Sequence, residues 1–157
     1  MFHKILIPLD GSKEAEKAID YALPLAKQLD SKVLVARFVD MPFVIGGYPV
    51  PRETIDQELS LTRHYLEHMK AKLEAEGLPV EISSPHLEPA AGILQLAESE
   101  GIDLIVMTSH GRTGLTRFFI GSVAERVCRH ACCPVLIVGR TSMKAKSPEL
   151  QLTTTAV

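Results

Sequence analysis

The segment MTSHGRTGLTRFFIGSVAERV, Met107 to Val127, holds the residues of this chain best suited to bind an anion. Its glycines would let the backbone approach a ligand closely, and the amide groups at the start of a following helix would favour negative charge. Hydroxyl and basic side chains add hydrogen-bond donors nearby: Ser109, His110, Arg112, Thr113, Arg117 and Ser122. By composition the segment resembles a phosphate-binding loop.

Two standard phosphate signatures are absent from the sequence. There is no G-x-x-x-x-G-K-[ST] motif, and no G-x-G-x-x-G follows the first apolar run. A purely structural interpretation is also available, because Ser122 followed by Glu125 fits a capping box, which needs no ligand. Gly114 is equally compatible with a simple turn. The residues alone leave a phosphate site and a structural connection both open.

Apolar runs alternate with segments of helical spacing along the chain. The runs that predict strands are Lys4–Leu9, Lys32–Val39, Pro79–Leu87, Ile102–Thr108 and Pro134–Gly139. The predicted helices begin after Ser12, near Glu53, at Pro89 and at Ser122, and end near Leu29, Glu76, Glu100 and Cys132. The proline- and glycine-rich segment from Asp40 to Pro51 is expected to be a loop.

This alternation predicts an α/β fold: one domain with an open, parallel, five-stranded sheet and helices on both faces, in a Rossmann-like arrangement. We expect the domain to span residues 1–140 and residues 141–157 to form a flexible tail. Parallel sheets of this type bind ligands outside the carboxyl ends of their strands. That rule brings Asp10, Phe38 to Asp40 and Thr108 to Gly114 around one crevice.

Composition limits the classes of function. The chain has 157 residues and a formal net charge of -2, which argues against nucleic acid as the main partner. No apolar run reaches the roughly 18 residues of a membrane span, and the opening MFHKILIPLD has no signal-peptide pattern. Three cysteines do not make a disulfide framework, so we expect a cytoplasmic protein.

Metal and catalytic sites are weakly indicated. His64 and His68 are spaced as a helical pair but lack a visible third ligand. Cys128, Cys132 and Cys133 do not follow a usual zinc spacing and are expected to pack at a helix end against the sheet. No set of nucleophile, base and acid can be recognised. We therefore predict no catalytic residues and no protein-held metal.

Three blocks of the sequence resemble the universal stress protein family in style and order: KILIPLDGS, IDLIVMTSHGRTG and GSVAERVCRHACCPVLIV. Nucleotide-binding members carry G-x2-G-x9-G-[ST] after the fourth strand. Here Gly111, nine residues and then Gly121-Ser122 match its second half, while Thr108 stands at the position of the first glycine. The resemblance covers about residues 2–140 and favours the nucleotide-binding branch, whose fold is adenine nucleotide alpha hydrolase-like.

The resemblance implies an ATP site, with Mg²⁺ or Mn²⁺ held through the phosphates. It assigns contacts with the base, the ribose and the phosphates to Pro8, Asp10, Phe38, Met107, Thr108, His110, Gly111, Gly121, Ser122 and Val123. It also implies a homodimer in which the last strands, Pro134 to Val138, pair antiparallel. The expected function is a nucleotide-linked stress-response switch. A slow ATPase or phosphotransferase, or a nucleotide-free dimeric interaction protein, are the alternatives.

Overall fold

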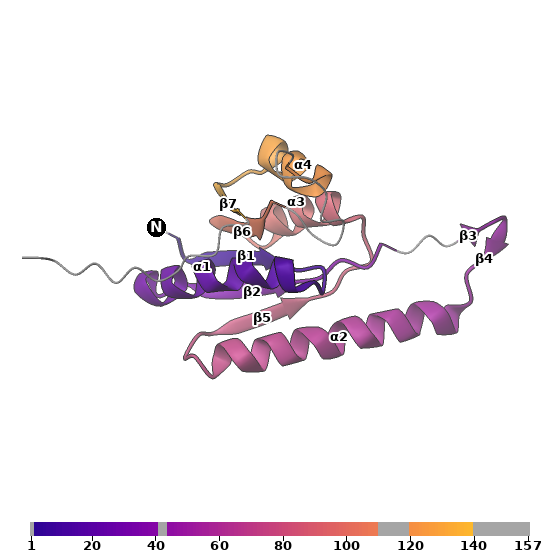
Figure 1. Ribbon diagram of the computed structural model, residues 1–157, viewed down its shortest axis with the longest axis horizontal. Coiled ribbons are helices and arrows are strands. Elements are labelled where there is room, and N and C mark those ends of the chain that lie inside the picture. The colour runs from indigo at the N-terminus through magenta and orange to yellow at the C-terminus, as the bar shows by residue number, and fades with distance from the viewer. Residues whose placement is uncertain (1, 41–43, 110–119, 140–157) are drawn as a thin grey trace, which may run out of the picture.

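The computed structural model describes residues 2–40, 44–109 and 120–139, and its main feature is a five-stranded sheet (Figure 1). The strand order is β5-β2-β1-β6-β7, and every pairing in this sheet is parallel. The strands are β1 Lys4–Pro8, β2 Lys32–Ala36, β5 Val80–Ser83, β6 Leu104–Thr108 and β7 Val135–Val138. The predicted open parallel sheet is confirmed. The predicted tail lies outside the described residues.

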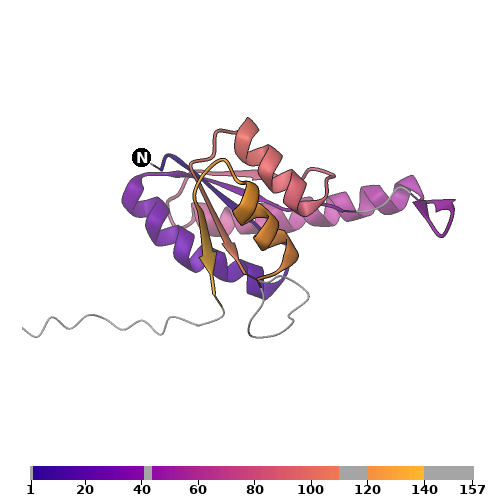
Figure 2. The ribbon, with the colours of Figure 1, turned by 90° about the horizontal axis from the view of Figure 1, so that it is seen from above.

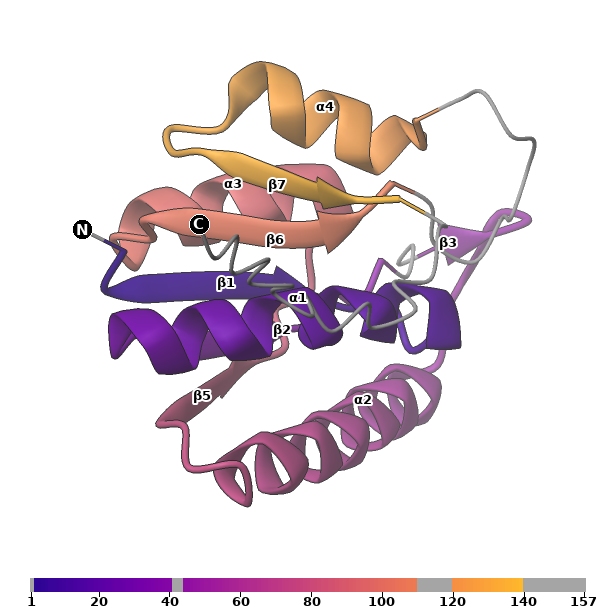
Figure 3. The same ribbon diagram turned by 60° about the vertical axis from the view of Figure 1, so that its left-hand side comes forward.

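Four helices cover both faces of the sheet: α1 Lys13–Leu29, α2 Arg52–Glu74, α3 Pro89–Ser99 and α4 Ser122–His130. Figure 3 shows α1 and α2 on one side of the strands and α3 and α4 on the other. Because successive strand residues point to opposite faces, Ile5 and Ile7 pack with α1 and α2, whereas Leu6 packs with α3 and α4. No helix in the described part of the chain is long and apolar enough to cross a membrane.

Local capping signals place the helix starts correctly. The Ser12 hydroxyl accepts a hydrogen bond of 3.1 Å from the Ala15 amide, so it caps α1 as expected. Pro89 is the first residue of α3, where its missing N–H costs nothing. The strands are shorter than predicted because ladder pairing stops at Ala36 and Ser83.

The segment expected to be a loop contains a small hairpin. β3 (Val44–Ile45) and β4 (Tyr48–Pro49) pair antiparallel, and the two glycines between them both have positive φ, 60° at Gly46 and 83° at Gly47. Two such residues form the turn type that matches strand twist, so Gly-Gly between apolar pairs was a hairpin signal, not a loop signal. Figure 2 shows the hairpin beyond the N-terminal end of α2, away from the sheet.

Candidate functional site

A pocket of about 550 Å³ lies at the carboxyl ends of β1, β2 and β6. From β1 the strands β2 and β5 extend the sheet toward one edge, and β6 and β7 extend it toward the other. The strand order therefore reverses between β1 and β6, beside the pocket. Open α/β sheets bind their ligands at such a point. The lining comes from residues 8–10, 37–40, 107–109 and 121–124, with Ala15, Glu58, Pro89 and Ile93.

The pocket brings most of the residues implied by the resemblance together. Pro8, Asp10, Phe38, Met107, Thr108, Gly121, Ser122 and Val123 all line it. His110 and Gly111 lie outside the described residues. Asp40, which follows the second predicted strand, also lines the pocket. Side chains far apart in the sequence thus share one surface.

The predicted start of α4 at Ser122 is confirmed. Gly121 is the residue that precedes the helix, and Ser122 is already its first helical residue. The alternative interpretation of Ser122 and Glu125 as a capping box is wrong, because the Glu125 side chain pairs with Arg129, with 3.0 Å between the carboxylate and the guanidinium. No side chain in the described part of the chain caps this helix. Its first-turn residues 122–124 instead line the pocket.

Two other helices also place first-turn residues at the pocket, and both are capped by side chains. Ser12 caps α1, and the Glu88 carboxylate caps α3 by accepting from the Ala90 and Ala91 amides at 3.1 and 2.9 Å. Partial burial raises the pKa of Glu88, but those amides and Arg126 outweigh it and leave the pKa below its usual value. Among the described helices whose first-turn residues line the pocket, α4 is thus the one whose positive dipole end is not opposed by a capping side chain.

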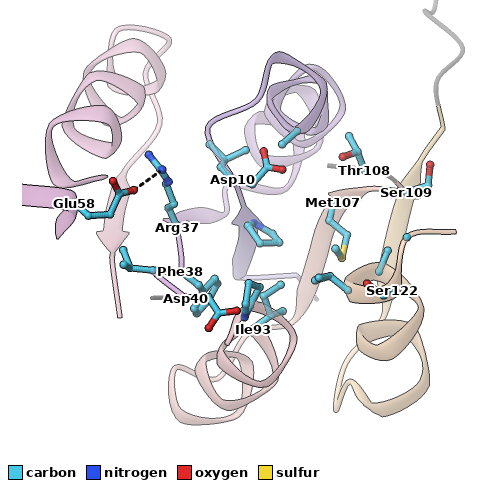
Figure 4. A pocket seen from close by; sticks show the side chains of 18 residues that line it. Asp10, Arg37, Phe38, Asp40, Glu58, Ile93, Met107, Thr108, Ser109 and Ser122 are labelled. Atoms are coloured by element: carbon cyan, nitrogen blue, oxygen red, sulfur yellow. Dashed lines mark hydrogen bonds and ion pairs between the residues drawn. The ribbon is translucent and has the colours of Figure 1, made fainter. Parts of the chain in front are cut away.

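One end of the pocket, which we call the amide end, consists of residues 107–109 and 121–124. The Gly121 amide donates to the Ser109 carbonyl at 2.7 Å, so the start of α4 is tied to the end of β6. The hydroxyls of Thr108, Ser109 and Ser122 lie on this side in Figure 4. Amides and hydroxyls supply hydrogen-bond donors without a negative charge, which suits an anion.

The opposite end, which we call the acidic end, consists of residues 37–40 and Glu58. The Arg37 guanidinium pairs with the Glu58 carboxylate at 3.1 Å and lies 5.6 Å from the centre of the Tyr65 ring. The charges of Arg37 and Glu58 offset one another, so the carboxylate of Asp40 gives this end a net negative charge. The two ends of the pocket therefore differ in charge, and a ligand with one anionic end is oriented by that difference.

Asp10 lies between the two ends in Figure 4. Its carboxylate accepts a hydrogen bond of 2.9 Å from the Ser12 amide, across a turn in which Gly11 has φ 85°. Asp10 thus shapes the connection from β1 to α1 and also lines the pocket. The Asp10 carboxylate therefore lies beside the middle of the pocket.

Arg37 and Glu58 are lining residues that sequence reasoning missed. A charged residue within the apolar run VLVARFV was a signal for Arg37, but nothing local indicated that Glu58, 21 residues later, would meet it. The Tyr65 hydroxyl donates to Glu16 at 3.2 Å. Burial, and then the Glu16 charge, raises the pKa of Tyr65, so it remains a neutral donor. These contacts fix α2 against α1 and the end of β2.

The described residues contain no cluster of candidate metal ligands. Within them no group of three or more His, Cys, Asp or Glu side chains is arranged to hold a metal ion, and His64 and His68 are exposed on α2. The cysteines depart from the prediction, because Cys128 and Cys132 are exposed instead of packed against the sheet. Cys133 is half-buried, and this burial raises the pKa of its thiol to about 11.

The sheet order, the two helical layers and the pocket at the switch point define a Rossmann-like α/β protein with a ligand site that favours an anion at one end. Residues 1–139 match the universal stress protein family, and the chain belongs to that family. It is 37% identical to universal stress protein MJ0531 of Methanocaldococcus jannaschii, over 88% of this chain and 82% of the relative.

Solved structures share the fold. The structure of MJ0577, a universal stress protein of the same organism, has a TM-score of 0.78 and 29% identity and covers 90% of this chain and 99% of its own. A universal stress protein family protein of Arabidopsis thaliana, solved with AMP bound, has a TM-score of 0.65 and 20% identity. It covers 93% of this chain and 97% of its own, and at that identity it supports the fold alone.

Proposed function

We propose that this chain is a cytoplasmic, ATP-binding universal stress protein that acts as a nucleotide-linked switch. The observation that carries the proposal is the N-terminus of α4, which lacks a side-chain cap among the described residues and borders the pocket through Gly121, Ser122 and Val123. A helix start of this kind is suited to phosphate. The volume of about 550 Å³ falls within the roughly 300–1,000 Å³ of small-molecule sites.

The charge difference along the pocket gives the nucleotide a direction. The phosphates bind at the amide end, because Asp40, whose charge the paired Arg37 and Glu58 do not offset, would repel them at the acidic end. The base then lies toward Phe38, with Pro8 and Met107 against the nucleotide and Asp10 beside the ribose. The sequence motif adds His110 and Gly111 to the ribose and phosphate contacts. The universal stress protein family protein of Arabidopsis thaliana was solved with AMP bound, and our proposal extends that ligand class to this chain.

A divalent ion, Mg²⁺ or Mn²⁺, would bind through the phosphates. Hard cations prefer oxygen ligands, and Asp10, Ser109 and Ser122 offer carboxylate and hydroxyl oxygens around the pocket. Within the described residues these do not form a protein cage, so the ion depends on the nucleotide. We assign no residue to catalysis.

The test is to identify what the protein carries. The purified protein is denatured, and any released nucleotide is identified by mass spectrometry; ATP with Mg²⁺ is then titrated into the nucleotide-free protein by calorimetry. We expect ATP to be released or to bind with a Kd of about 1–100 μM. The proposal is rejected if no nucleotide is released and ATP at about 1 mM gives no binding heat. Turnover above that of a Gly121→Asp variant would favour the slow ATPase alternative.

We also propose that the chain forms a homodimer through β7. This strand is the last in the sheet order, and Leu136 is 36% exposed. The carbonyls of Pro134 and Val138 accept from the amides of Ile105 in β6 and of Ser109 just after it. Because alternate residues face a parallel neighbour, the peptide groups of Val135 and Ile137 face away from β6 toward the free edge. An edge of this kind pairs readily with a second copy across a two-fold axis.

Ile137→Pro tests the dimer, since it removes a donor from the outer side of β7, where proline is tolerated. Light scattering at roughly tens of micromolar should show a dimer for the parent and for Ile137→Val, and a monomer for Ile137→Pro with an unchanged circular dichroism spectrum. A monomeric parent would exclude the dimer. If Ile137→Pro remains dimeric, the dimer interface lies on a surface other than β7.

A further inference from the structure

Gly92, in the second turn of α3, has Phe38 packed directly on its backbone. A Cβ atom added at Gly92 would lie 2.3 Å from Cδ1 and 2.5 Å from Cε1 of the Phe38 ring, distances that real Cβ atoms do not show. The glycine is buried in α3. The ring therefore occupies the space that any other residue at position 92 would need.

The backbone at Gly92 does not itself require glycine. Its φ is not positive, and it lies within a regular helix, where alanine is preferred to glycine. A Cβ atom would meet nothing within 4 Å at five other glycines: Gly46, Gly47, Gly77, Gly101 and Gly139. The contact with Phe38 is thus the feature of this position that demands the absence of a side chain.

Phe38 lines the pocket at its acidic end, near Ile93 in Figure 4. Gly92 does not line the pocket, although Pro89 and Ile93 on the same helix do. The ring thus lies between the Gly92 backbone and the pocket. Its position decides how wide the pocket is at this end.

We propose that Gly92 is a positioning residue that holds the Phe38 ring back against α3 and so keeps the acidic end wide enough for the two-ring base of a purine nucleotide. The inference rests on the proposed nucleotide-binding function. With a side chain at position 92 the ring must move. Leu87 lies 3.2 Å from the added Cβ, and the Phe38 ring already packs against a cluster of buried side chains, so the open direction is toward the pocket that the ring lines.

The test combines Gly92→Ala with Phe38→Val, whose smaller side chain removes the clash. Calorimetric Kd values for ATP are measured for the parent, both single variants and the double variant. We expect Gly92→Ala to weaken ATP binding by about tenfold or more in the parent background and by less than about threefold in the Phe38→Val background. Gly139→Ala is the matched control, because its added Cβ meets nothing within 4 Å, and should leave the Kd unchanged.

The thermal unfolding midpoint gives a second readout. Gly92→Ala should lower the midpoint when Phe38 is present and should lower it less, or raise it, in the Phe38→Val background, where the gain in helix propensity is opposed only by the 3.2 Å contact with Leu87. Equal losses of affinity in both backgrounds, or a Gly92→Ala variant that binds ATP within about threefold of the parent, would overturn the inference. A parent protein that binds no nucleotide would instead reject the proposed function on which it rests.

Discussion

Gly121→Asp separates the stability of the fold from the binding of phosphate. Gly121 precedes α4 with φ −59° and ψ 151°, a conformation open to any residue. Aspartate is a favoured capping residue, and its charge suits the start of a helix. The substitution should therefore leave the free energy of unfolding unchanged or raise it by a few tenths to about 1 kcal/mol.

The same carboxylate would stand where the phosphates are proposed to bind. Two unit charges about 5 Å apart repel by about 3 kcal/mol at an effective dielectric constant of about 20. That energy corresponds to a loss of about two orders of magnitude in ATP affinity. Further loss follows because the new carboxylate would compete for the first-turn amides of α4. Stability and affinity should thus move in opposite directions.

Gly121→Asn is the matched control, since asparagine caps a helix equally well and has nearly the same shape without the charge. Calorimetry with ATP and Mg²⁺ and urea unfolding are measured for the parent and both variants. We expect a smaller loss of affinity for Gly121→Asn than for Gly121→Asp. If the aspartate variant binds ATP as tightly as the parent, the phosphates do not lie at α4. If the two variants lose affinity equally, the electrostatic argument is wrong.

Three further substitutions test separate features. The buried Thr62 hydroxyl has no hydrogen-bond partner within the described part of the chain, so Thr62→Val should raise the free energy of unfolding by about 1 kcal/mol in urea titrations. Hydrogen bonds from the His3 and Lys4 amides lower the pKa of Asp103 in the folded protein. The contribution of Asp103 to the free energy of unfolding is therefore present above its unfolded-state pKa and is lost as the pH falls through the lower folded-state pKa. In urea titrations between about pH 7 and about pH 3, the free energy of unfolding of Asp103→Asn should vary less than that of the parent. Thr108→Gly restores the motif glycine and should change the Kd for ATP by less than about tenfold in calorimetry, whereas complete loss of binding would show that the threonine is a required contact.

Much of the fold was predictable because its signals are local. Buried parallel strands read as apolar runs, and Ser12 and Pro89 mark helix starts by chemistry that acts within one turn. The hairpin at Gly46 and Gly47 was also encoded locally, but the loop prediction weighed the number of glycines and prolines and ignored their order. The sequence therefore contained the hairpin signal, and the loop prediction misinterpreted it.

The site was predictable only where it follows from topology. The carboxyl ends of neighbouring parallel strands necessarily meet, so Asp10 and Thr108 could be placed together from the strand assignment. The pair of Arg37 and Glu58 could not, because it depends on how α2 packs against the end of β2. The contact of Phe38 with Gly92 is of the same kind: it requires the distance between two side-chain positions, which no spacing in the sequence contains.

The charge difference between the two ends of the pocket follows from how α1, α3 and α4 begin, because the first turns of these helices line it. Each would present positive potential to the same volume, and an anion would then have no preferred end. Ser12 satisfies an amide of α1, and the Glu88 carboxylate accepts from two first-turn amides of α3 and so opposes its dipole. Arg126 of α4 pairs with Glu88 at 2.9 Å, so the residue that caps α3 also contacts α4. Removing the Glu88 charge would leave the dipole of α3 without its capping carboxylate and would therefore reduce the difference in potential between the two ends of the pocket.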